Sequence, residues 1–145
     1  MKWANLLRAD KIKITPQATV GMTRWLRKQF ATNRPYDEMV RELIATNGRP
    51  ESAPAAGFAL GDAANPMALA GATSQIFLGV RMQCAECHDH PFDDWKQKEF
   101  YDLAAFFGTI KRVEAGKNVK RIYTTEGNET AVKWPPEREQ PAKRD

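Results

Sequence analysis

The two cysteines of this chain, Cys84 and Cys87, are separated by only two residues, and this spacing constrains how the chain can fold. Two cysteines cannot supply the disulfide framework of a small secreted scaffold, and a bridge between neighbours so close would be a redox or cofactor feature. The fold must therefore be stabilised by a hydrophobic core. With 145 residues, 42% of them hydrophobic, the sequence is long enough for one domain with such a core and too short for two ordinary ones.

Charge and hydropathy exclude two classes of partner. The 22 Lys and Arg against 18 Asp and Glu give a formal net charge of +4 without dense basic runs, so we expect no nucleic-acid partner. Charged residues interrupt every apolar stretch before the roughly 18 residues of a membrane span, so we expect no membrane span. Residues 1–8 lack the continuous apolar region and the cleavage site of a secretory signal.

Apolar residues recur at helical spacing in five segments of the first 107 residues. Two of these segments start with a cap residue followed by proline, at Thr15-Pro16 and Asn65-Pro66, and Asp93 or Asp94 is the predicted N-cap of the last one. Residues 48–65 contain proline and glycine among alanines without a period that would bury one face, which predicts a long ordered loop. The predicted helices span residues 2–9, 16–31, 36–44 (with Asn47-Gly48 as the stop signal), 66–79 and 94–107.

The sequence pattern changes after Lys120. Residues 121–125 and 130–134 have the composition of short strands around a glycine-containing turn, which predicts a hairpin. Residues 135–145 combine three prolines with alternating charge, as linkers do. We therefore expect a mainly α fold, with about five helices, a long ordered loop and a small C-terminal β-hairpin. It would form one domain over residues 1–134, followed by a linker or flexible tail over 135–145.

The functional signal lies in Cys84-Ala85-Glu86-Cys87-His88, which contains both cysteines and one of the two histidines. Covalent attachment of a c-type haem needs two thiols that reach the vinyl groups of one porphyrin edge, and an adjacent imidazole for the iron. On a helical turn, positions i, i+3 and i+4 project from one face. The motif therefore predicts a haem c bound through Cys84 and Cys87, with His88 as an axial ligand of the haem iron.

Two other interpretations of the motif stay open. Cys84, Cys87, His88 and His90 are a possible donor set for zinc, although four donors within seven residues leave little chain for a tetrahedral cage. Alternatively, the cysteines pack as small hydrophobic residues and His88 bonds locally. In either case the chain would be a non-redox structural or interaction domain.

A haem also needs apolar walls and, for a six-coordinate iron, a second axial ligand. His90 follows His88 too closely to reach the opposite face of a porphyrin. A distal thioether would have to come from Met22, Met39 or Met67, each of which is better explained as part of an apolar helical stripe. The candidate wall residues are Phe77, Val80, Phe92 and Phe107.

A longer string around the motif, from Phe77 to Asp93, resembles the planctomycete cytochrome c-like domain family of unknown function. The resemblance continues through Gln97 and residues 100–107, and it extends to residues 2–8, 33–37 and 42–44 upstream. It implies that Cys84 and Cys87 attach the haem, that His88 is the axial ligand, and that the protein is a secreted bacterial protein, usually a longer multidomain chain.

From the motif and the resemblance together we expect an extracytoplasmic location, periplasmic or secreted. The expected partners are a redox partner or neighbouring domains of a longer parent chain. We expect an electron carrier or accessory domain more than an independent enzyme, and we assign no catalytic residue.

Overall fold

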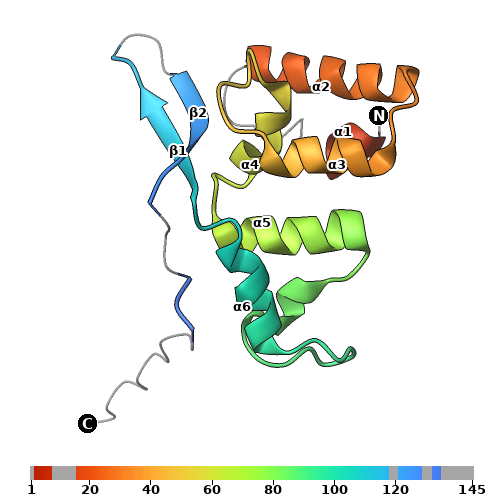
Figure 1. The fold of residues 1–145 in the computed structure, drawn as a ribbon, viewed down its shortest axis with the longest axis vertical. Coiled ribbons are helices and arrows are strands. Elements are labelled where there is room, and N and C mark those ends of the chain that lie inside the picture. Colours follow the sequence, from red (N-terminus) through yellow and green to blue (C-terminus); the bar gives the residue numbers. More distant parts are fainter. Residues whose placement is uncertain (1, 8–15, 118–120, 129–131, 135–145) are drawn as a thin grey trace.

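The computed structural model describes residues 2–7, 16–117, 121–128 and 132–134, which form six α-helices and a two-stranded antiparallel sheet (Figure 1). This confirms the mainly α fold with a small hairpin. The helices are α1 (Lys2–Leu6), α2 (Pro16–Ala31), α3 (Tyr36–Ala45), α4 (Gly57–Gly61), α5 (Pro66–Thr73) and α6 (Gln97–Ala105). Two 3-10 helices, η1 (Pro54–Ala56) and η3 (Met82–Glu86), and a π-helix, η2 (Ser74–Leu78), complete the helical elements. Thr15 and residues 135–145 lie outside the described residues.

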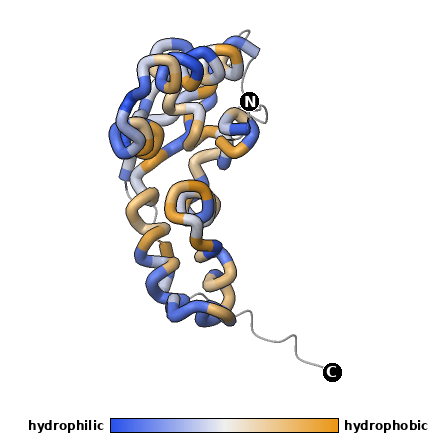
Figure 2. The backbone as a smooth tube through the Cα atoms, turned by 90° about the vertical axis from the view of Figure 1, so that its right-hand side faces the viewer, coloured by the Kyte–Doolittle hydropathy of each residue, from blue (hydrophilic) through white to orange (hydrophobic). Residues whose placement is uncertain are grey.

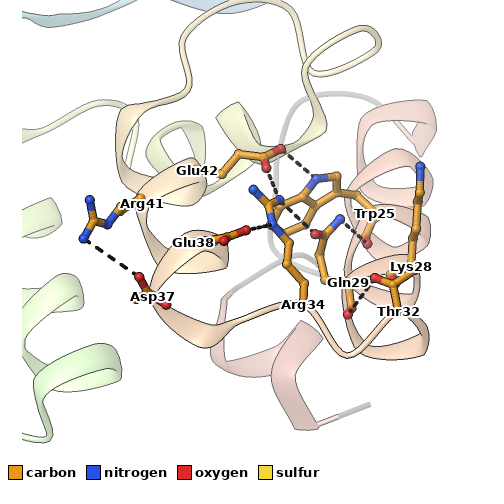
Figure 3. Close-up of polar contacts among 9 residues, drawn as sticks. All are labelled: Trp25, Lys28, Gln29, Thr32, Arg34, Asp37, Glu38, Arg41 and Glu42. Atoms are coloured by element: carbon orange, nitrogen blue, oxygen red, sulfur yellow. Dashed lines mark hydrogen bonds and ion pairs between the residues drawn. The ribbon is translucent and has the colours of Figure 1, made fainter.

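Helices α2 and α3 run side by side in opposite directions (Figure 1), and a polar network joins them (Figure 3). The indole N–H of Trp25 donates to a carboxylate oxygen of Glu42 (2.9 Å), and Arg34, between the helices, pairs with the same carboxylate. Arg34 also donates to the side-chain oxygen of Gln29 (2.9 Å) and pairs with Glu38 (3.3 Å). The hydrogen bond to Glu42 is the largest cause of the raised pKa of the Arg34 guanidinium.

The buried side chains form one hydrophobic cluster that extends from α1 to the end of α6. Helix α5 lies in the middle of the molecule, where it is seen nearly end-on in largely hydrophobic colours (Figure 2), and its residues 69–73 are all buried. No helix in the described part of the chain is both long and apolar enough to cross a membrane. The largest buried side chains of the cluster are those of Leu7, Met22, Leu26, Leu43, Leu69 and Phe100.

The predicted loop over residues 48–65 is wrong in its second half. Residues 54–61 form η1 and α4, and this helical segment contacts both α2 and α3. The reason is physical: a short helix that is buried on nearly all sides has no polar face, and therefore no amphipathic period to detect. Its buried apolar side chains are Ala55, Ala56, Phe58, Ala59 and Leu60.

Asn65 caps α5 as predicted, because its side-chain oxygen accepts the N–H of Ala68 (3.0 Å). The helix continues through η2 and ends at Gly79, whose left-handed φ of 72° suits glycine. The predicted start of α6 is wrong. The helix begins at Gln97 instead of near Asp94. Its N-cap is Lys96, whose backbone N–H donates to the side chain of Glu99 in the first turn (2.7 Å).

A small antiparallel hairpin is present as predicted, but it is formed by another pair of strands. Strand β2 (Arg121–Glu126) pairs with β1 (Ile110–Ala115), which directly follows α6, and not with residues 130–134. Residues 130 and 131 lie outside the described residues, and Val132–Trp134 are not in a strand. Instead, the ring of Trp134 packs 5.1 Å from that of Tyr101 on α6, centroid to centroid.

The hairpin is attached to the end of α3 by a bridge between Gly48 and Thr124. The N–H of Gly48 donates to the carbonyl of Thr124 (2.9 Å), and the N–H of Thr124 donates back (3.1 Å). Gly48 has a φ of 124°, which a residue with a side chain rarely adopts. The bridge brings β2 to the ends of α3 and α6, where a cavity forms.

Candidate functional site

Cys84 and Cys87 lie on a turn whose other side is anchored in the core. Cys84 is part of the 3-10 helix η3, and Cys87 follows its last residue with helical backbone angles (φ −101°, ψ −29°). Residues three apart stack on one side of a 3-10 helix. Met82 and Ala85 form a buried row, whereas Cys84 is half-buried and Cys87 is exposed, and both thiols are free.

His88 lies just beyond this turn and is exposed. The predicted helical turn does not extend to His88, because η3 ends at Glu86 and Cys87 is its C-cap. The ring is held in another way: its Nδ1 lies 2.5 Å from the backbone carbonyl oxygen of Asp89. A carbonyl oxygen only accepts, so Nδ1 is the donor in this hydrogen bond and Nε2 is the ring nitrogen that remains for a metal.

Helix α6 holds the end of the cysteine turn through a single carbonyl group. The side-chain amide of Gln97 (2.9 Å) and the hydroxyl of Tyr101 (3.2 Å) both donate to the backbone oxygen of Glu86. Burial, followed by the charges of Glu86 and Cys87, raises the pKa of the Tyr101 hydroxyl, so it keeps its proton and stays a donor. Sequence reasoning did not assign this role, although the i, i+4 spacing of the two donors is a signal for it.

Asp89 joins the segment after the motif to the start of α6. Its carboxylate accepts the backbone N–H of Gln97 (2.9 Å) and lies 3.4 Å from the ammonium group of Lys96. These contacts, the bond from Gln97 first, lower the pKa of the Asp89 carboxyl. Asp89 therefore connects His88 to α6: its backbone oxygen contacts the His88 ring, and its side chain contacts the start of the helix.

His90, the fourth donor of the zinc interpretation, has its own partners in the following loop. Its side chain is 6% exposed, and its Nδ1 accepts the N–H of Phe92 (3.2 Å), while the carboxylate of Asp93 lies at 3.8 Å. The backbone N–H of His90 donates to the carbonyl of Trp95 (2.8 Å). Among the described residues, no three His, Cys, Asp or Glu side chains are gathered in a way that would hold an ion.

The predicted haem walls and distal methionines divide between surface and core. Phe92 is 90% exposed beside the motif, whereas Phe107 is buried in the core. Met22 and Met39 are buried in the same core, as packing predicts. Met67 is half-buried and lines a cavity of about 300 Å³ together with Glu86 and Tyr101, at the end of the cysteine turn. Phe77 and Val80 are half-buried and pack against the core.

Comparison with known protein families places the chain in a family of unknown function. A protein-family model described as "PSCyt2: Protein of unknown function (DUF1549)" matches residues 1–112. This range contains the cysteine turn, His88 and the whole of α6. No curated protein and no solved structure matches the chain.

Proposed function

This chain belongs to the PSCyt2 family of proteins of unknown function, and we propose that it is a c-type haem-binding domain that transfers electrons. The thiols of Cys84 and Cys87 would hold the haem by adding across its two vinyl groups. Each addition forms one C–S bond and moves the thiol hydrogen to the neighbouring carbon, so no oxidant is needed. Nε2 of His88 would be the axial ligand. When bound, the haem supplies an iron that exchanges single electrons between its ferrous and ferric states.

The observation that carries this proposal is the hydrogen bond between His88 Nδ1 and the carbonyl of Asp89. Histidines that bind a metal almost always donate their other ring N–H to a carbonyl, carboxylate or water, which fixes the tautomer and the ring orientation. Here the same bond leaves Nε2 free on an exposed ring that directly follows two free thiols. The donor set of this turn therefore fits a c-type haem.

The exposure of Cys87 and His88 argues against the alternative in which the motif only packs. A cysteine that packs as a small hydrophobic residue is normally buried. The zinc alternative is disfavoured because no three His, Cys, Asp or Glu side chains are gathered in a way that would hold an ion in the part of the chain that the structure describes.

The proposal also includes the finer assignment that the sequence resemblance implies. In it, the chain is a planctomycete cytochrome c-like domain that acts outside the cytoplasm. It would exchange electrons with a redox partner or with neighbouring domains of a longer parent chain. No residue of the chain is assigned to that partner.

The experiment is to export the chain through a bacterial secretion signal together with a c-type haem maturation system. Visible absorption is then recorded after denaturation and acid–acetone extraction, which removes haem that is not covalently bound. We expect the haem spectrum to stay with the protein, and the Cys84→Ser/Cys87→Ser double variant to lose it.

His90→Asn is the matched histidine control, because the asparagine oxygen is able to accept the Phe92 N–H in place of Nδ1. We expect this variant to keep its haem, whereas His88→Ala should lose the axial ligand and change the spectrum. Extraction of all haem from the unmodified chain, or a colourless exported protein, would contradict the proposal.

A further inference from the structure

We propose a second site, independent of the haem proposal: a cavity at the base of the hairpin that binds a small apolar molecule with a hydrogen-bond-donating head group. The cavity has a volume of about 420 Å³ and lies where the ends of α3, α5 and α6 meet β1 and β2. Small-molecule sites commonly have volumes of roughly 300 to 1,000 Å³. Most of its wall is apolar, with Ile44, Leu103 and Phe107 among the side chains that line it.

Two polar atoms in this apolar wall are buried without a hydrogen-bond partner among the residues that the structure describes. They are the side-chain oxygen of Asn47 and the hydroxyl oxygen of Thr73. Thr73 is only 7% exposed. Buried polar atoms of folded proteins are nearly always paired, and an unpaired one lowers stability, so each unpaired atom calls for an explanation. Because Asn47 and Thr73 both line the cavity, we infer that a bound ligand is the missing partner of these atoms.

The polar atoms also indicate what the ligand must offer. The amide nitrogen of Asn47 donates to the carboxylate of Glu126 (3.3 Å), which leaves its oxygen as an acceptor in the wall. The Thr73 hydroxyl is also able to accept, and Glu126 is the charged residue among those that line the cavity. Acceptors with one negative charge favour a head group that donates hydrogen bonds, such as a hydroxyl or a protonated amine. They disfavour a carboxylate or a phosphate.

Water is a poor occupant of this cavity, because a water molecule in a cavity needs several polar partners and most of this wall is apolar. The cavity wall also includes Phe106, which is 82% exposed at the end of α6. An apolar ligand body beside this ring would cover a large side chain that otherwise faces solvent. The expected ligand is therefore an aryl or alkyl body with an alcohol or amine at one end.

The test measures binding of four probes to the complete chain by calorimetry and by NMR. The probes are 2-phenylethanol, 2-phenylethylamine, ethylbenzene and 3-phenylpropanoate, which share the ring and differ in the head group. We expect the alcohol or the amine to bind about two- to tenfold more tightly than ethylbenzene, the range of one added hydrogen bond, and the carboxylate to bind most weakly. Glu126→Gln distinguishes the two head groups, because it should weaken binding of the amine and leave the alcohol unaffected.

Thr73→Val keeps the shape of the side chain and removes the hydroxyl, so it should reduce the preference for the alcohol over ethylbenzene. Phe106→Ala should weaken binding of both the alcohol and ethylbenzene. The matched control Phe92→Ala changes another highly exposed phenylalanine that does not line the cavity, and it should leave binding of both probes unchanged. Nuclear Overhauser contacts between the bound ring and Phe106 or Ile110 locate the ligand in the unmodified chain, even if a variant fails to fold. Equal affinity for all four probes, no saturable binding, or contacts elsewhere would overturn the proposal.

Discussion

Nδ1 of His88 lies 2.5 Å from the backbone carbonyl oxygen of Asp89, and the carboxylate of that same Asp89 accepts the N–H of Gln97 at 2.9 Å. One residue thus fixes the proton on the histidine ring with its backbone and connects the segment to α6 with its side chain. The orientation of His88 therefore depends on contacts that the polypeptide makes without any bound group.

Asp89→Asn should change how stability depends on pH in the acid range. The pKa of Asp89 is lowered in the folded chain below its ordinary value of 3.8, chiefly by the Gln97 N–H. A lowered folded pKa means that the carboxylate stabilises the fold fully above the unfolded value, and that this contribution is lost as the pH falls through the folded value. Urea unfolding from about pH 6 to 2.5 should show a steeper acid loss for the unmodified chain than for the variant. Superimposable profiles would contradict this role of Asp89.

Removing both donors to the Glu86 carbonyl should loosen the cysteine turn. In the Gln97→Ala/Tyr101→Phe variant that oxygen loses its two α6 partners, at 2.9 and 3.2 Å. We expect the backbone N–H of Cys84, which donates to Arg81 within the turn, to exchange with deuterium faster. Tyr123→Phe on the hairpin is the control and should leave this exchange rate unchanged. An unaltered rate in the double variant would show that α6 does not hold the turn.

Trp25→Phe should destabilise the α2–α3 pair by about 1 kcal/mol, the net contribution of one hydrogen bond, because Glu42 loses its indole donor. The measurement is the free energy of unfolding in urea. Tyr36→Phe, which also changes one polar aromatic group but on an exposed position of α3, should stay within about 0.5 kcal/mol. Equal effects of the two substitutions would mean that the Trp25–Glu42 bond does not stabilise the fold.

Phe100→Ala should destabilise the fold by about 3 to 5 kcal/mol, because its fully buried ring would leave a cavity in the core. Phe106→Ala, six positions along the chain and 82% exposed, should cost less than about 0.5 kcal/mol. Thermal and urea unfolding measure both. Comparable losses for the two variants would contradict the burial of Phe100 in the core.

The sequence predicted best where apolar residues alternate with polar ones at helical spacing. Helices α2 and α3 were found this way, because each presents one face to the core. The same reasoning failed for α4, which is buried nearly all round, and for β1, which was assigned to no element. The partner of β2 depends on pairing between segments, which periodicity within one segment does not report.

The sequence motif identifies the candidate haem-binding residues, but it does not predict the hydrogen bonds that hold them in place. Cys84, Cys87 and His88 are adjacent in sequence, so a motif is sufficient to find them. The contacts of Asp89, Gln97 and Tyr101 depend on how α6 folds back on the cysteine turn. The predicted cap at Asp93 or Asp94 failed for a related reason: the local Lys96–Glu99 bond starts α6 later.

The most direct test of the haem proposal is the intact mass of the exported chain, measured under denaturing conditions after expression with a c-type maturation system. We expect a mass larger than that of the polypeptide by one haem, and the polypeptide mass alone for the Cys84→Ser/Cys87→Ser variant. If the unmodified chain shows only the polypeptide mass, in cells where a reference c-type cytochrome acquires its haem, the proposed attachment at this turn is contradicted.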